Sequence, residues 1–367
     1  MKKCFYILSL TIGILVCATV LVSCSSDNEK PEKEEQPSPL EGETFSSEDG
    51  CFSYTFINGG KELELKRVNH SGYIPEVGEY KGKNFPVTRI GNYACGEDTH
   101  ISEIPEGIVS IGVGAFKYNT HWYIKLPSTL RIIEKEAFAF NKYLGKVDIS
   151  NGITVIPNSA FAFCEKLESI NIPESVKNIE EYAFNGCSNL ANITIPNSVI
   201  SIGVYAFYDC GLYSITIPGS VTTIGKGAFE GCQLKSLTLL EGVETIEEGA
   251  FANCKELSEV SLPNSLKIIG DIAFLSCKSL ISITIPENVT SIGVAAFSDK
   301  QTSQGGKTIS GEDCLKKVIS LIDNPFPIDR AFGHNFNNYG ILYVPKGTSE
   351  KYKSTEGWKE IQTIIEQ

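Results

Sequence analysis

The stretch "ITIPNSVISIGVYAFYDC" spans Ile193 to Cys210, and nearly the same phrase returns as "ITIPGSVTTIGKGAFEGC" from Ile215 to Cys232. The Ala-Phe pair inside it serves as a ruler, because it recurs every 22 or 23 residues. Its Phe falls at Phe116, Phe138, Phe161, Phe184, Phe207, Phe229, Phe251, Phe274 and Phe297. Such a period indicates a stack of equivalent units, called rungs below, each of which buries its apolar face on its neighbours.

Each position of the phrase predicts a local structure. The alternation in Ile-x-Ile predicts a short strand with both Ile side chains inward, and strands of successive rungs should pair in parallel. The Pro that follows, as at Pro196, has no N–H to donate and should end the strand. The segment x-x-Ala-Phe-x-x-Cys should form a helical turn that buries the Phe. The Gly of Ile-Gly should be tolerated rather than required, because Pro157, whose φ is negative, occupies the equivalent place.

The repeat also resembles a known family. A period in the twenties with Leu and Ile at fixed offsets is typical of leucine-rich repeats, and "IPNSVISIGVYAFYDC" resembles the BspA-type leucine-rich repeat of Bacteroidetes surface proteins. The resemblance covers roughly Arg89 to Phe332. We therefore expect a leucine-rich-repeat solenoid of stacked parallel short strands with helical turns over residues 89–332. An insertion at 298–314 interrupts the repeat.

Both ends of the array should be capped, since a terminal rung otherwise exposes its apolar face to water. Residues 45–88 predict an N-terminal β cap, with a hairpin around Asn58-Gly59-Gly60. Residues 333–367 predict a mixed C-terminal cap, since "LYVPKGTSEKYKSTEGWKEIQTIIE", from Leu342 to Glu366, resembles the closing segment of the same family. In this cap Leu342 and Val344 add a last strand, and the end of the core is covered by Tyr352, Trp358 and Ile364.

The first 44 residues contain patterns that predict where the protein is located. Lys2 and Lys3 precede an apolar run, which is the pattern of a secretory signal over residues 1–23; a run of about 18 apolar residues also fits a membrane anchor. "LVSC", ending at Cys24, resembles a bacterial lipobox and implies lipidation of Cys24. The acidic, Pro-containing residues 24–44 predict a disordered tether. Their early acidic residues resemble an export signal, which implies an outer membrane lipoprotein facing the exterior; a periplasmic orientation stays open.

Composition and motifs argue against several functions. The formal net charge of −12 is unsuited to nucleic acid, whose phosphates need clustered Lys and Arg. The four His residues form no HExxH pattern, and neither a G-x-S-x-G elbow nor a Walker loop occurs. We therefore expect no enzyme activity, no catalytic residues, no metal and no cofactor.

Six of the twelve cysteines form a column, each three residues after a ruler Phe: Cys164, Cys187, Cys210, Cys232, Cys254 and Cys277. Metal sites favour close Cys pairs, which the sequence lacks. Disulfides between neighbouring rungs would be compatible with an oxidising compartment. A buried free Cys also behaves as a small hydrophobe. We favour buried, reduced thiols.

The residue between the two inward Ile should face solvent on the strand side. Solenoids commonly bind partners through such an extended face, and Trp and Tyr are enriched at binding hot spots. The candidate binding face comprises His121, Trp122, Tyr123, Lys125, Lys146, Asp148, Asn171, Thr194, Thr216 and Thr238. Small hydroxyl residues also suit a merely solvated sheet.

The resemblance implies a monomeric cell-surface adhesion protein that recognises an unidentified protein of a host matrix or a partner cell. Two alternatives stay open. One is a glycan-binding surface lipoprotein of a nutrient-uptake system, with the aromatic residues stacking on sugars. The other is a structural envelope protein.

Overall fold

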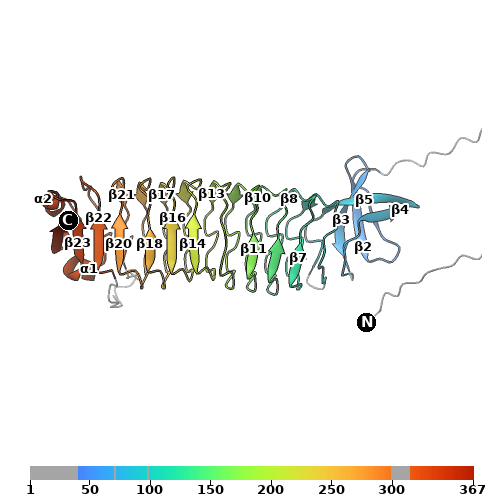
Figure 1. The fold of residues 1–367 in the computed structure, drawn as a ribbon. Coiled ribbons are helices and arrows are strands. Elements are labelled where there is room, and N and C mark those ends of the chain that lie inside the picture. The colour runs from blue at the N-terminus through green and yellow to red at the C-terminus, as the bar shows by residue number, and fades with distance from the viewer. Residues whose placement is uncertain (1–39, 70–71, 97–98, 299–314) are drawn as a thin grey trace, which may run out of the picture. The chain divides into compact units, whose positions relative to one another are not determined.

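The computed structural model describes residues 40–69, 72–96, 99–298 and 315–367. Within them, short strands lie side by side in a long row, with a β region at the N-terminal end and a mixed cap at the C-terminal end (Figure 1). The predicted signal segment, Cys24 and most of the predicted tether lie outside the described residues. So does all of the predicted insertion except Ser298.

The N-terminal region contains two hairpins, of which the sequence predicted the first. β2 (Phe52–Ile57) and β3 (Glu62–Val68) pair antiparallel around Asn58, Gly59 and Gly60, all of which have positive φ. β1 (Thr44–Ser46) flanks β2. The second hairpin joins β4 (Val77–Tyr80) to β5 (Lys83–Ile90). Since β5 also pairs in parallel with β3 and with the first rung, it converts antiparallel pairing into the parallel stack.

Each rung contributes strands to two sides of the stack. One side, the Ile-x-Ile face, carries β7 (Tyr123–Lys125), β9 (Lys146–Asp148), β11 (Ser169–Asn171), β14 (Ser214–Ile217), β16 (Ser236–Leu239), β18 (Glu259–Ser261) and β20 (Ser282–Ile285). The other side carries β6 (Ser110–Ile111), β8 (Ile132–Ile133), β10 (Val155–Ile156), β12 (Asn178–Ile179), β13 (Ser201–Ile202), β15 (Thr223–Ile224), β17 (Thr245–Ile246), β19 (Ile268–Ile269) and β21 (Ser291–Ile292). Pairing between rungs is parallel, as in Ile215 opposite Leu237. The predicted solenoid is confirmed.

A spine of stacked phenylalanines runs through the core. The nine ruler Phe side chains and Phe332 stack with ring centroids 5.0–5.6 Å apart and interplanar angles of 4–13°. Most are fully buried. The Ala before each Phe is buried as well. From Ala137 onward its carbonyl accepts a hydrogen bond from the previous rung's Phe, as in Phe207 N–H to Ala228 O at 2.8 Å.

The turn around each Ala-Phe pair is not helical, contrary to the local prediction. In every rung the residue before the Ala has positive φ, as at Tyr182 (56°) and Ile272 (49°). The residue two after the Phe does so in most rungs. Left-handed residues interrupt a right-handed helix. Their strain is offset by hydrogen bonds between rungs, such as Tyr182 N–H to Val204 O at 3.0 Å. The sequence does not predict this turn, because bulky residues as well as Gly occupy the two positions that have positive φ.

The Gly of the Ile-Gly pair is more constrained than predicted. Its φ is not positive in any rung, as expected. However, a Cβ added at Gly203 would lie 2.7 Å from the amide nitrogen of Glu181, and one at Gly293 would lie 2.3 Å from that of Asp271. At these rungs Gly is needed because the previous rung lies so close.

The C-terminal cap closes the stack. β22 (Lys317–Ser320), β23 (Ile341–Val344) and β24 (Thr363–Glu366) extend the sheet that begins with β20. α1 (His334–Tyr339), α2 (Ser349–Ser354) and the 3-10 helix η1 (Trp358–Glu360) lie between these strands in sequence. Tyr352 and Trp358 are fully buried, as predicted. The strand of Leu342 and Val344 is not the last one, because Ile364 belongs to a further strand, β24.

Candidate functional site

The cysteine column is a structural hydrogen-bond ladder. All six cysteines are buried, and no disulfide is assigned to any of them. Each donates to the carbonyl of the ruler Phe one rung earlier at 3.0–3.2 Å, as Cys210 Sγ does to Phe184 O at 3.1 Å. Burial raises the pKa of Cys164, Cys210 and Cys254 well above the ordinary thiol value. No cluster of three or more His, Cys, Asp and Glu suited to a metal occurs among the described residues.

These thiols should be inert while the protein is folded. We expect a chain starting at Ser25 and carrying Cys314→Ser to leave its eight remaining cysteines unmodified by Ellman's reagent in native buffer. The reactive species is the exposed thiolate, and burial removes both exposure and charge. All eight should react within minutes in guanidinium chloride. Rapid native modification of more than two equivalents would contradict this ladder, because only Cys51 and Cys95 of the eight lie outside it.

The ladder has one defective step, at Asn141. This residue lies three residues after Phe138, in the position of the column cysteines, and is fully buried, and neither its Oδ1 nor its Nδ2 has a hydrogen-bond partner within the described structure. The preceding Asn119 is satisfied, because its Nδ2 donates to Thr99 O at 2.7 Å and its Oδ1 accepts from His121 N–H at 2.9 Å.

We expect Asn141→Cys to stabilise the fold by about 1–2 kcal/mol in urea denaturation. The change removes two unsatisfied buried groups, each of which costs about 1–3 kcal/mol, and places a thiol near Phe116 O. Asn119→Cys is the matched control and should destabilise, since it breaks two hydrogen bonds. A neutral or destabilising Asn141→Cys would show that the amide has a partner in solution.

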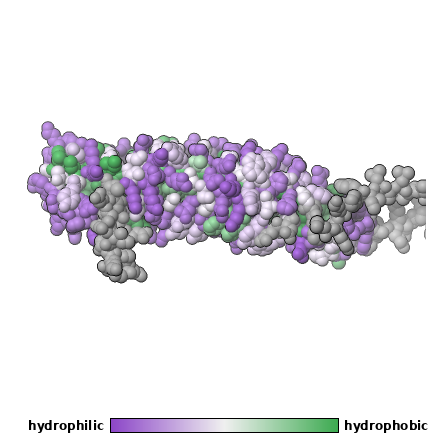
Figure 2. All heavy atoms as spheres, turned by 90° about the horizontal axis from the view of Figure 1, so that it is seen from below, coloured by the Kyte–Doolittle hydropathy of each residue, from purple (hydrophilic) through white to green (hydrophobic). Residues whose placement is uncertain are grey.

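The candidate binding face points outward as predicted. In the column between the inward Ile, Lys125, Asn171, Thr194 and Thr216 are exposed, whereas Asp148 and Thr238 are half-buried. Parallel register aligns Lys125 with Asp148 and Asp148 with Asn171 on neighbouring strands. The side of the stack seen in Figure 2 is mostly polar, with scattered apolar patches.

At the N-terminal end of this face, three predicted residues contact one another. Tyr123 Oη donates to Asp148 Oδ2 at 2.8 Å, and Lys146 Nζ lies 3.4 Å from Asp148 Oδ1. The Lys146 ammonium also lies 5.8 Å from the centre of the Tyr123 ring. The hydrogen bond to Asp148 raises the pKa of the Tyr123 phenol. The polar groups of Tyr123, Lys146 and Asp148 are therefore paired with one another. Lys125, in contrast, forms no ion pair with any described residue.

Trp122 and His121 are placed differently. The Trp122 side chain is 57% exposed, and its indole lies against Gly145, where a Cβ would come within 2.2 Å of Nε1. Gly145 therefore makes room for the indole on the next rung. The His121 ring is tied to its own loop, since Nδ1 lies 3.0 Å from Tyr123 O. The His121 ring therefore serves mainly to hold this loop in place rather than to offer a binding surface.

Sequence reasoning missed a partly exposed aromatic strip on the turn side. Tyr118, Phe140 and Phe163 stack with centroids 5.2 and 4.9 Å apart, and all three have positive φ. They occupy the second left-handed position of three successive rungs, where later rungs carry Gly186 or Asp209. The repeat pattern gave no signal for the strip, because this position is aromatic in these three rungs and not in the later ones.

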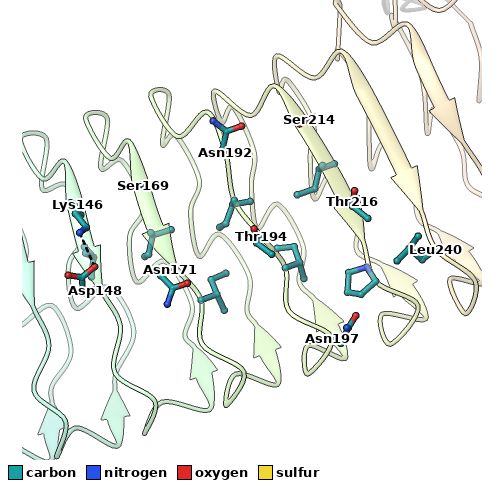
Figure 3. Close-up of a pocket in the computed structure, with 17 residues that line it drawn as sticks. Lys146, Asp148, Ser169, Asn171, Asn192, Thr194, Asn197, Ser214, Thr216 and Leu240 are labelled. Atoms are coloured by element: carbon teal, nitrogen blue, oxygen red, sulfur yellow. Dashed lines mark ion pairs between the residues drawn. The ribbon is translucent and has the colours of Figure 1, made fainter.

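Sequence reasoning also missed an interruption of the Ile-x-Ile face. The strands fall into separate sheets β7–β9–β11 and β14–β16–β18, because the rung between them, residues 191–195, forms no strand. Its sequence, with Ile193, Thr194 and Ile195, matches the paired rungs, so no signal in the repeat predicts the break. A hollow of about 680 Å³ lies there, lined by residues from Lys146 to Leu240 (Figure 3).

Among the described helices, none combines the length and apolar character needed to cross a bilayer.

Comparison with known proteins identifies the repeat. The family model described as the BspA type leucine rich repeat region matches residues 83–191 and 177–304 in six copies. A solved leucine-rich repeat protein from Bacteroides ovatus is 24% identical with a TM-score of 0.51, covering 86% of this chain and 97% of its own.

Two further solved structures are similar. A leucine rich cell surface protein from Faecalibacterium prausnitzii is 22% identical with a TM-score of 0.45, covering 87% of this chain and 98% of its own. The pneumococcal vaccine antigen PcpA is 19% identical with a TM-score of 0.44, covering 90% and 100%. No curated protein matches. The family model covers more than half of the chain, and the chain belongs to the BspA-type leucine-rich repeat family.

Proposed function

We propose that this chain is a cell-surface binding protein that recognises macromolecules of a host or a partner cell through its Ile-x-Ile face. The single observation that carries the proposal is the exposed group at the N-terminal end of that face. It combines a largely exposed indole at Trp122 with the unpaired ammonium of Lys125. Trp is enriched at binding hot spots, where it buries a large rigid area.

The rest of the chain supports a role in binding rather than in chemistry. The described residues hold no cluster of His, Cys, Asp and Glu suited to a metal, and their eight cysteines are buried. Family membership agrees with a repeat scaffold whose extended surface contacts partners.

We further propose that Cys24 carries the lipid that holds the chain on the outer membrane, facing the exterior. The lipobox-like "LVSC" supports this. A labelled fatty acid should enter the full-length chain expressed in a Bacteroidetes host and not its Cys24→Ala variant. Protease added to intact cells should then release the repeat region. Label in both chains would refute the anchor, and protection from protease would refute the exterior orientation.

The binding proposal is tested on paired arrays of extracellular matrix proteins and polysaccharides, using the chain from Ser25 onward. We expect saturable binding to a matrix protein that Trp122→Ala and Lys125→Glu each weaken at least tenfold. Tyr339→Ala removes an exposed ring from α1 in the C-terminal cap and should leave binding unchanged. Sugar binding that is lost in Trp122→Ala would favour nutrient capture, and silence on both arrays would favour a structural role.

A further inference from the structure

The interrupted rung leaves backbone groups open on the Ile-x-Ile face. None of the amides of residues 191–195 donates a hydrogen bond to any described residue, whereas Tyr213 N–H in the next rung donates to Ala191 O at 3.0 Å. The spine beneath stays regular, with Phe184 and Phe207 stacked at 5.1 Å. The opening is therefore confined to the surface.

A second break in the sheet is also accompanied by a hollow. The sheet also breaks between β18 and β20, and a hollow of about 390 Å³ lies there, lined by Ser236, Thr238, Ser261, Ser282 and Thr284 among others. The larger hollow has open backbone donors and no aromatic ring among its lining residues.

The larger hollow is walled by uncharged hydrogen-bonding groups. Its lining includes Asn171, Asn192 and Asn197 together with Ser169, Thr194, Ser214 and Thr216. These side chains extend from successive rungs along two rows (Figure 3). Its only charged members, Lys146 and Asp148, neutralise each other at one end. Buried Ile170 and Ile195 supply an apolar floor.

We propose that this hollow binds an uncharged, linear polysaccharide laid across the rungs. Amides and hydroxyls both donate and accept, which suits a ligand covered in hydroxyl groups. The open amides of 191–195 add donors that a paired strand does not have. The inference rests on the proposed surface-binding function but assigns a ligand class and a separate place on the same face.

Spacing favours a glycan over a peptide. The rungs repeat every 5.0–5.6 Å along the spine, so each row presents one polar side chain at that interval. An extended peptide advances about 3.3 Å per residue and falls out of register after one rung. Successive pyranose rings of an extended chain repeat at nearly the rung spacing, so each ring can meet one pair of side chains.

Charge favours a neutral glycan over an anionic one. The chain carries a formal net charge of −12, which repels polyanions at a distance. Within the hollow, the single cation Lys146 is already paired with Asp148. A uronate or sulfate group would find no unpaired cation among the lining residues.

Calorimetry with hexasaccharides of β-linked glucose, xylose and galactose, and with a polyuronide as the anionic member, tests the proposal. We expect a neutral hexasaccharide to bind, and the double variant Asn171→Ala/Asn192→Ala to bind at least tenfold more weakly. Thr194→Trp should abolish binding, because the indole would fill the centre of the hollow. Thr222→Ala changes an exposed Thr on the opposite side of the stack and should bind as the parent does.

Amide hydrogen exchange gives an independent readout. In the free protein, residues 192–195 should exchange faster than 214–217, and the bound hexasaccharide should slow them. Equal protection in the free protein, binding only of the polyuronide or a peptide, or no neutral binding at millimolar concentration would each overturn the proposal. If the same protein still binds a matrix protein, the hollow alone is refuted; if it binds neither, the surface-binding function fails as well.

Discussion

Phe207→Ala should lower the free energy of unfolding by about 3–5 kcal/mol. The Phe207 ring is fully buried between Phe184 at 5.1 Å and Phe229 at 5.0 Å, almost parallel to both. Its neighbours cannot close in, because hydrogen bonds between rungs fix the backbone on both sides, including Phe184 N–H to Ala206 O at 2.8 Å. The substitution therefore leaves a cavity, and the cost of a cavity rises with the volume that fails to collapse.

Urea denaturation followed by circular dichroism measures this loss, and Phe163→Ala is the matched control. Phe163 lies two residues after a spine Phe and is 38% exposed, so its removal should cost about 1 kcal/mol or less. A loss below about 1 kcal/mol in Phe207→Ala would mean that the spine relaxes, and that the rungs are held mainly by their backbone ladder.

The sequence predicts the solenoid well because its signals are redundant. The ruler Phe, the inward Ile pairs and the strand-ending Pro each recur in many rungs, so an error in one rung is corrected by the others. Parallel pairing then follows, since equivalent strands of successive rungs run in the same direction. The Cys column was visible for the same reason, although the carbonyl that each thiol meets belongs to the previous rung and cannot be read from spacing.

What the sequence does not predict depends on contacts between rungs. The left-handed turn is invisible because the same position accepts Tyr182, Gly227 and Ile272, and the hydrogen bond to the next rung, not the side chain, sets the conformation. At residues 191–195 the strand pairing is lost, although the sequence of this rung has the same Ile-x-Ile pattern as the paired rungs. At the candidate site, the outward residues were predictable by alternation, but the mutual pairing of Tyr123, Lys146 and Asp148 and the support of Trp122 by Gly145 were not.

Trp358→Ala should cost about 3–5 kcal/mol and should also cause the chain to self-associate. Trp358 is fully buried over the last spine ring, with its centroid 5.6 Å from that of Phe332 and 5.1 Å from that of Tyr352. Its Nε1 donates to Phe326 O at 2.9 Å. Losing the indole leaves a cavity, orphans that carbonyl, and exposes the end of a core that no later rung covers.

The other tryptophan of the chain is the control for this experiment. Trp122 is 57% exposed, so Trp122→Ala should change stability by less than about 1 kcal/mol and remove the red-shifted part of the fluorescence. Trp358→Phe keeps most of the apolar contact and should lose about 1–2 kcal/mol through the unpaired carbonyl. Melting and light scattering on all three variants separate the effects. If Trp358→Ala were as stable and monomeric as Trp122→Ala, β24 alone would suffice to close the stack, and the helices of the cap would need another role.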